Sequence, residues 1–269
     1  MACLALLWVG LVSCAGERGQ WIDRSDQTSF SRMVADVRRA RVIFVGEFHD
    51  QRSHHQLQLD IIKTLHADGS RLAIGLEMFG LESQAALDRW VRGTMSLQEF
   101  VTTYQRNWTI PWAEYDTILL YARNNRIPLV ALDAPNDIVR QITHLGFSSL
   151  SADQLARLPV GVDASMDDAY RQFMADAFAG HGLPEMLFAN FCAAQALRNN
   201  TMNAQIGRVL TADPGLTMVV ITGVGHAMKN AVAARLTART GMSTRVIVPV
   251  VEGMFEAMGE GEADYFVSQ

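Results

Sequence analysis

Short runs of apolar, often β-branched residues recur along the chain, and a stretch with helical spacing follows most of them. Five such runs are typical of buried strands, and they cover residues 41–45, 71–76, 127–132, 216–222 and 244–251. Between the runs, apolar positions recur every three to four residues, as in helices with one buried face. Strands that alternate with helices are typical of a mainly parallel sheet covered on both faces. The sequence therefore predicts an α/β fold with about five strands flanked by helices.

Two stretches between the predicted strands are longer than a single crossover helix needs. Residues 81–125 are helical in pattern and rich in aromatic side chains, and residues 148–212 contain no run that resembles a strand. We expect both to be helical insertions within one domain that spans residues 28–251. A short polar tether at residues 15–27 precedes this domain, and an acidic tail at residues 252–269 follows it.

The first thirteen residues carry no charge and end in Leu11-Val12-Ser13-Cys14. A bilayer span needs about 20 apolar residues, so this stretch suits the hydrophobic region of a signal peptide better. Its end resembles the bacterial lipobox, in which the cysteine is lipidated. We therefore expect a signal peptide at residues 1–14, a lipid anchor on Cys14 and a place in the bacterial cell envelope. Ala15 after the cysteine favours the outer membrane; a core helix or an uncleaved anchor is the alternative.

Composition narrows the functional classes. A chain of 269 residues with 49% hydrophobic and 19% charged residues can bury a substantial core. Its net charge is −5, and its lysines and arginines are scattered, so we expect no nucleic-acid partner. Of its three cysteines only Cys192 lies within the predicted domain, in an apolar helical context that favours a core thiol.

Ionisable side chains follow four of the predicted strands. Glu47 and His49 come after the first strand, Glu77 after the second, Asp133 after the third and His226 after the fourth. Because the carboxyl ends of parallel strands meet at one edge of a sheet, we expect these residues to converge. Imidazole and carboxylate groups bind zinc, iron or manganese, and they also perform general acid–base catalysis.

Each of these residues also has a structural explanation. Glu47 suits the N-terminus of the next helix, Glu77 can pair with an arginine, and Asp133 before Ala-Pro can cap a helix. His54 and His55 begin a predicted helix, where we expect His54 to face solvent and His55 to point inward. The coincidence at successive strand ends is what favours a site.

Several of these segments together match a known family. Gly46-Glu47-Phe48-His49 and Gly223-Val224-Gly225-His226 repeat a Gly-x-x-His pattern, each at the end of an apolar strand. The other matching segments are Gly75-Leu76-Glu77-Met78-Phe79, His54-His55, residues 108–115, residues 131–135, and Tyr170 ahead of Phe178 and His181. From about residue 41 to residue 250, this ordered set resembles the Tiki superfamily and, more closely, the ChaN family of haem-binding lipoproteins linked to bacterial iron uptake.

The resemblance implies a membrane-tethered lipoprotein that captures haem and passes it to transport machinery. It also implies a homodimer that stacks two haems, with a tyrosine on the iron. Tyrosinate is a hard anionic ligand that favours ferric haem. On this resemblance Tyr170 and His181 are the candidate haem-binding residues, with a packed core tyrosine as the alternative for Tyr170.

A second hypothesis is a hydrolase, because other branches of the superfamily resemble enzymes that cut peptides or esters. Glu47 would then activate water, with Glu77 as the second catalytic carboxylate. A divalent zinc, manganese or iron ion would be held by His49, His226, Glu47 and Glu77. Where we would expect an acidic residue in relatives, this chain has Asn199 and Asn200, which disfavours the hydrolytic interpretation.

Overall fold

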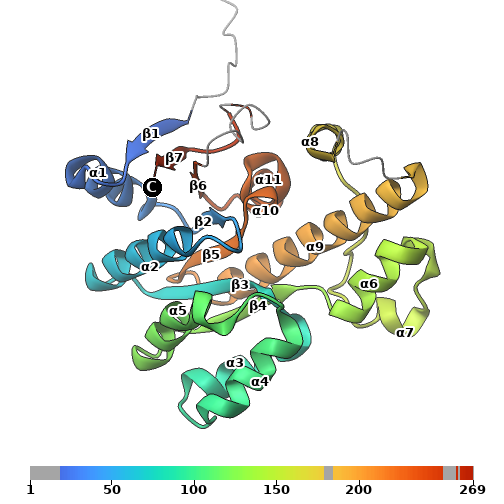
Figure 1. Ribbon diagram of the computed structural model, residues 1–269, viewed down its shortest axis with the longest axis horizontal. Coiled ribbons are helices and arrows are strands. Elements are labelled where there is room, and N and C mark those ends of the chain that lie inside the picture. Colours follow the sequence, from blue (N-terminus) through green and yellow to red (C-terminus); the bar gives the residue numbers. More distant parts are fainter. Residues whose placement is uncertain (1–18, 179–183, 251–258, 260, 269) are drawn as a thin grey trace, which may run out of the picture.

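A single sheet of seven strands, all parallel to their neighbours, forms the centre of the molecule (Figure 1). The computed structural model describes residues 19–178, 184–250, 259 and 261–268. The strand order is β1-β7-β6-β2-β5-β3-β4. The strands are β1 (Gln20–Asp23), β2 (Val42–Glu47), β3 (Leu72–Gly80), β4 (Leu129–Asp133), β5 (Thr217–Gly223), β6 (Thr244–Pro249) and β7 (Tyr265–Ser268). The predicted α/β fold with a mainly parallel sheet is confirmed, but the sheet has seven strands and not about five.

The two additional strands lie at one edge of the sheet. β1 falls in the predicted tether and β7 in the predicted acidic tail, and the two pair with each other. Each is four residues long, and in β1 only Ile22 is buried. A four-residue edge strand with one inward side chain has no periodic signal, so the pattern of apolar residues missed it.

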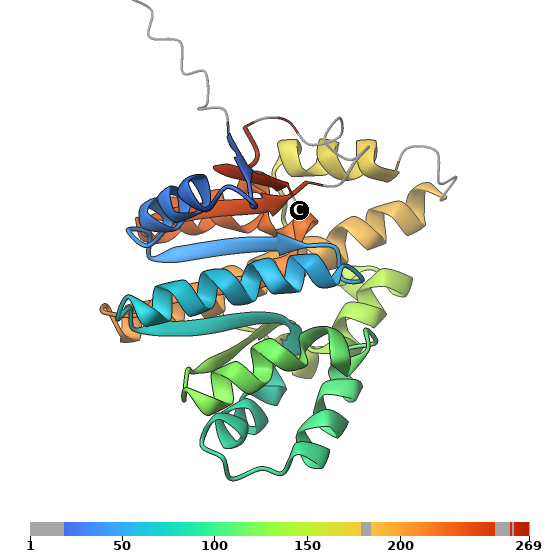
Figure 2. The ribbon, with the colours of Figure 1, turned by 60° about the vertical axis from the view of Figure 1, so that its left-hand side comes forward.

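Helices cover both faces of the sheet (Figure 2). The α-helices are α1 (Gln27–Val37), α2 (Arg52–Ala67), α3 (Gln84–Val91), α4 (Leu97–Asn107), α5 (Trp112–Asn124), α6 (Asn136–Leu145), α7 (Ala152–Leu155), α8 (Asp168–Phe178), α9 (Glu185–Ala212), α10 (Val224–Ala227) and α11 (Ala234–Thr240). The described residues also form two short 3₁₀ helices, η1 (Leu81–Ser83) and η2 (Phe147–Ser149), and one π-helix, η3 (Lys229–Ala233). Helices α3 to α5 lie in the first predicted insertion, and α7 to α9 lie in the second.

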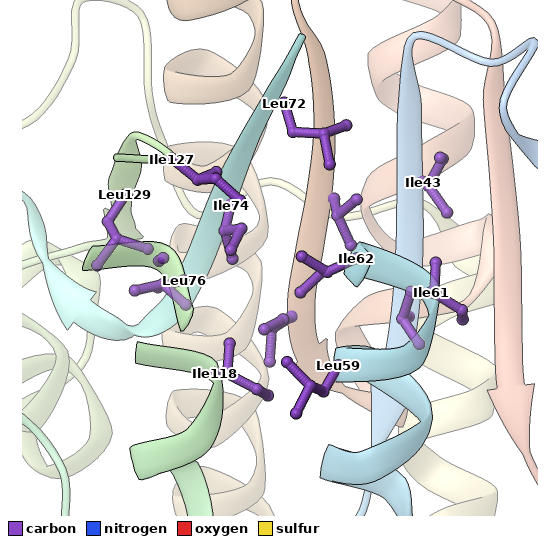
Figure 3. Packing of buried hydrophobic residues seen from close by; sticks show 14 of the residues in the cluster. Ile43, Leu59, Ile61, Ile62, Leu72, Ile74, Leu76, Ile118, Ile127 and Leu129 are labelled. Carbon is purple, nitrogen blue, oxygen red and sulfur yellow. The ribbon is translucent and has the colours of Figure 1, made fainter. Parts of the chain in front are cut away.

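The two faces of the sheet pack against different helices. Ile43 and Val45 of β2 face the side covered by α1 to α5, where residues such as Ile61 of α2 and Ile118 of α5 fill the core (Figure 3). The alternate residue Phe44 faces the other side, which α9, α10 and α11 cover. Because β2 is buried at every position, it reads in the sequence as one apolar run.

Helix α9 extends beyond the edge of the sheet (Figure 2). Helix α9 has 28 residues, so it is about 42 Å long. Its second half packs on the sheet, while its first half extends past the carboxyl ends of the strands, where α6, α7 and α8 lie (Figure 2). No helix in the described part of the chain combines the length and apolar character needed to cross a bilayer.

Candidate functional site at the carboxyl edge of the sheet

Four neighbouring strands, in the order β2-β5-β3-β4, bring the predicted polar residues together. Glu47 ends β2 beside Gly223 of β5, and Asp133 ends β4 beside β3. Glu77, Asp133 and His226 are buried, as Glu47 is. Carboxylates and imidazoles in a core are costly unless they have partners, so the contacts of each residue define what this edge can do.

Glu47 is held by donors from two helices. Tyr115 of α5 donates its hydroxyl to Glu47 Oε1, and Gln58 of α2 donates its Nε2 to Oε2 across 2.7 Å. His49 Nδ1 lies 2.8 Å from Oε1, and His55 Nε2 lies 3.4 Å from Oε2. Because both of its oxygens accept hydrogen bonds, Glu47 orients the side chains that contact it, among them His49.

His49 is the most accessible member of the cluster. Its side chain is 35% exposed, and its ring stands edge-on to Trp108 at 4.9 Å between centroids. Burial lowers the pKa of His49, but the hydrogen bond to Glu47 and the negative charge of Glu77 outweigh it, so the pKa is raised overall. A Cβ atom on Gly223 would lie 3.0 Å from His49 Cε1, so any larger residue there would require the ring to move.

The turn after β2 is fixed by His54. Its Nδ1 accepts a hydrogen bond of 3.0 Å from the backbone N–H of Phe48, one residue before His49. Burial lowers the pKa of His54 to about 4, so the ring is neutral and able to accept. The expectation that His54 faces solvent is therefore wrong. His55 points inward as expected, between Glu47 and Glu114.

Glu77 lies at the centre of the cluster. Its Oε2 accepts from the hydroxyl of Thr222 at 2.5 Å and from the backbone N–H of Gly223 at 2.6 Å. Its Oε1 accepts from Arg198 at 2.7 Å. Burial acts to raise the pKa of Glu77, but the positive charges and hydrogen bonds around it hold the pKa well below its usual range.

Arg198 of α9 bridges two strand ends. Besides Glu77, its Nε donates to both oxygens of Asp133, at 3.0 and 2.9 Å. Burial raises the pKa of Asp133 despite this partner. Helix α6 begins at Asn136, so Asp133 belongs to the ion-pair network and does not cap the helix. The arginine expected as an alternative partner of Glu77 is Arg198, which no sequence signal identified.

His226 lies between Asn199 of α9 and Glu77 of β3. His226 Nδ1 lies 2.5 Å from Asn199 Oδ1, and its Nε2 lies 3.5 Å from Glu77 Oε1. Burial lowers the pKa of His226 to about 4. Asn199 and Tyr170 line the same small cavity, and burial raises the pKa of Tyr170 to about 12.

The predicted metal ligands are not arranged as a metal site. Within the described ranges, no group of three or more His, Cys, Asp or Glu side chains could hold a metal ion. Arg198 donates a hydrogen bond to Glu77, and His226 Nδ1 is hydrogen-bonded to Asn199. Both carboxylate oxygens of Glu47 already accept hydrogen bonds, from Gln58 and Tyr115. A divalent metal held by His49, His226, Glu47 and Glu77 thus stays a prediction without a matching geometry.

Tyr170 of α8 lies in an apolar cluster between α8 and α9. Tyr170 is 2% exposed and packs with Met174 and Cys192. The partly buried side chains around this group are Met166, Phe173, Phe188 and Phe191. The cavity beside Tyr170 has a volume of about 10 Å³, which suits one water molecule, so a porphyrin needs these side chains to move apart. The predicted residues His181 and Cys14 lie outside the described residues.

A family model described as "Haem-binding uptake, Tiki superfamily, ChaN" matches residues 33–236. The chain belongs to the ChaN family. ChaN of Campylobacter jejuni, which binds haem cofacially, is similar to this chain with a TM-score of 0.69 and 17% identity, over 88% of this chain and 91% of that one. At that identity the likeness shows the fold alone.

Two further structures share the fold of this ChaN family member. The erythromycin esterase EreC has a TM-score of 0.53 and is 15% identical, and the match covers 83% of this chain and 73% of EreC. The type III effector HopBA1 has a TM-score of 0.51 and is 12% identical, and the match covers 89% of this chain and 93% of HopBA1. In sequence, Protein RETICULATA-RELATED 5 of Arabidopsis thaliana chloroplasts is 25% identical over 210 residues. The match covers 72% of this chain but 28% of that relative, so this chain spans less than a third of it.

Proposed function

We propose that this chain captures haem at the bacterial cell envelope, as one step of haem and iron uptake. The observation that carries the proposal is the ChaN family match over residues 33–236, which includes the strand-end cluster, α8 and α9. In the proposal, a lipid on Cys14 anchors the chain to the outer membrane, and haem transport machinery receives the cargo. The proposal also includes a homodimer that forms on haem binding.

The haem site in this proposal is the face formed by α8 and the first half of α9. Its methionine and phenylalanine side chains suit a porphyrin, and Met186 and Leu187 add exposed apolar surface at the start of α9. Tyr170 is the proposed iron ligand. When ferric haem is bound, Tyr170 would hold the iron through its phenolate oxygen, and the phenol proton would be released to solvent.

A hemin titration tests haem capture directly. Purified protein should shift the Soret band of hemin in a saturable way, and Tyr170→Phe should weaken binding and remove the tyrosinate signature. Tyr121→Phe is the matched control, because Tyr121 lies on α5 and contacts His66 instead. If the wild type gives no saturable spectral change, the proposed function is wrong.

Lipidation has its own test. Cells grown with labelled palmitate should yield labelled protein in the membrane fraction, and Cys14→Ala should lose both the label and the membrane association. If the wild-type protein is unlabelled and lies in the periplasmic fraction, the lipid anchor is wrong, while haem capture is still tested separately by the hemin titration.

A second candidate function is hydrolysis, and the pair of His49 and Glu47 favours it. A partly exposed imidazole oriented by a buried carboxylate is the arrangement of a general base, with Arg198 nearby as a positive charge. In this geometry His49, and not Glu47, is the group able to take a proton from water. Hydrolysis of a panel of chromogenic esters and peptides, with His49→Asn as the inactive control, tests this function. Elemental analysis of protein prepared without chelator tests whether a metal is bound.

A further inference from the structure

Strand β4 forms one end of the sheet, and in the described ranges β3 is the one strand that pairs with it (Figure 1). In a parallel pair, successive residues turn their backbone groups alternately toward the neighbouring strand and away from it. Ile74 of β3 donates its backbone N–H to Pro128 O at 2.9 Å, so Pro128 and Val130 face β3. Leu129 and Ala131 therefore face the outer edge, where a further strand would pair.

The side chain of Gln84, the first residue of α3, occupies this outer edge. Its Nε2 donates to Leu129 O at 2.9 Å, and its Oε1 accepts from the backbone N–H of Ala131, also at 2.9 Å. A backbone carbonyl can only accept and a backbone N–H can only donate, so the two contacts fix the orientation of the amide. Gln84 thus bonds a carbonyl and the N–H two residues later, as one residue of an adjacent parallel strand does.

A second glutamine reaches the same edge from the other face of the sheet. Gln205 of α9 is buried, and its Nε2 lies 3.4 Å from Ala131 O, to which it donates. Leu129 and Ala131 are themselves buried, and buried backbone groups need partners in the protein. Two side-chain amides, from helices on opposite faces, supply the hydrogen bonds that a strand would otherwise make.

The sequence of β4 explains why this edge needs to be closed. Residues 127–132 read Ile-Pro-Leu-Val-Ala-Leu and carry no charge. An uncharged apolar strand with unpaired backbone groups is a template for a strand of another chain. Among identical chains, the closed arrangement is a two-fold pair in which the same edge meets itself. The partner that fits this edge is therefore β4 of a second copy.

We infer that the outer edge of β4 is a strand-binding surface that Gln84 and Gln205 keep occupied, and that the strand they exclude is β4 of a second copy of this chain. The inference is independent of the proposed function, because neither glutamine belongs to the strand-end cluster or to the surroundings of Tyr170. It also means that the homodimer of the proposed function uses a surface other than this edge.

The experiment uses the haem-free full chain and begins with Gln84→Met, which keeps the length of the side chain but removes both hydrogen bonds. By NMR, the Ala131 amide should exchange with solvent roughly 10-fold faster relative to the Val130 amide, which faces β3. In sedimentation velocity, this variant should associate beyond the wild-type state as its concentration rises. Gln98→Met is the matched control, since Gln98 is exposed on α4, and it should change neither readout.

Gln84→Lys separates strand pairing from general aggregation. Lysine cannot accept from the Ala131 N–H, so exchange should again be fast, but its charge on the edge should repel a second copy and preserve the wild-type sedimentation. Gln84→Ala replaces Gln84→Met if that variant does not fold. Wild-type exchange at Ala131 in the Gln84 variants would show that Gln84 does not hold the edge. Unchanged sedimentation of Gln84→Met, or equal association of Gln84→Lys, would show that β4 of a second copy is not the excluded strand.

Discussion

Arg198 on helix α9 donates a hydrogen bond of 2.7 Å to Glu77 in strand β3, across 121 positions of sequence. Glu77 is buried, the side chain of Arg198 is 13% exposed, and Asp133 is the other carboxylate of the network. Removing one partner of a buried ion pair leaves the other charged group without compensation, which costs far more than the pair contributes. This asymmetry makes the contact a sensitive test of the geometry.

Glu77→Gln should destabilise the fold by about 3–5 kcal/mol, because Arg198 then faces a single carboxylate in the core. Urea unfolding monitored by circular dichroism measures the loss. The control is Arg71→Gln, which breaks an ion pair of the same 2.7 Å length to Asp213 on the surface and should cost at most about 1 kcal/mol. Equal losses in the two variants would mean that the Glu77 network is solvated.

His49 should make stability depend on pH with a characteristic sign. Its pKa is raised in the folded protein, so the charged imidazole stabilises the fold fully below its ordinary value of 6.5. That contribution disappears as the pH rises through the folded-state pKa. The difference in unfolding free energy between wild type and His49→Asn should therefore shrink from pH 6 upward. A difference that grows with pH contradicts the contact with Glu47.

His54 should act in the opposite direction. Its folded-state pKa is lowered from 6.5 to about 4, so between these values the unfolded chain binds more protons. Its contribution is complete above pH 6.5 and is lost as the pH falls toward 4, by up to about 1.4 kcal/mol per pH unit. His54→Asn should flatten the acid side of the stability profile. An unchanged acid slope would mean that His54 is protonated in the fold.

Gly223→Ala should displace His49. The new Cβ atom would lie 3.0 Å from His49 Cε1, closer than side-chain carbons approach without movement. We expect a loss of about 1–3 kcal/mol and, by NMR titration, a fall of the His49 pKa as the ring leaves Glu47. Gly225→Ala is the control, since no atom lies within 4 Å of its added Cβ; a similar effect there would exclude a specific clash.

The sequence was sufficient for the centre of the fold because buried parallel strands are continuous apolar runs. It also placed Glu47, Glu77, Asp133 and His226 at one edge, since parallel strands end on the same side. It could not supply the partners that determine their chemistry. The apolar spacing of a helix does not indicate which of its polar residues faces the site. The partners that helices supply are Gln58, Tyr115, Arg198 and Asn199.

The pairing of β1 with β7 has a consequence for synthesis. β1 is the first strand of the described chain to leave the ribosome, and β7, its neighbour in the sheet, is the last. β7 also lies between β1 and β6, so the sheet cannot extend to β1 until β7 has been added. The central strands can pair while translation continues, but β1 cannot pair with β7 until residues 265–268 have left the ribosome.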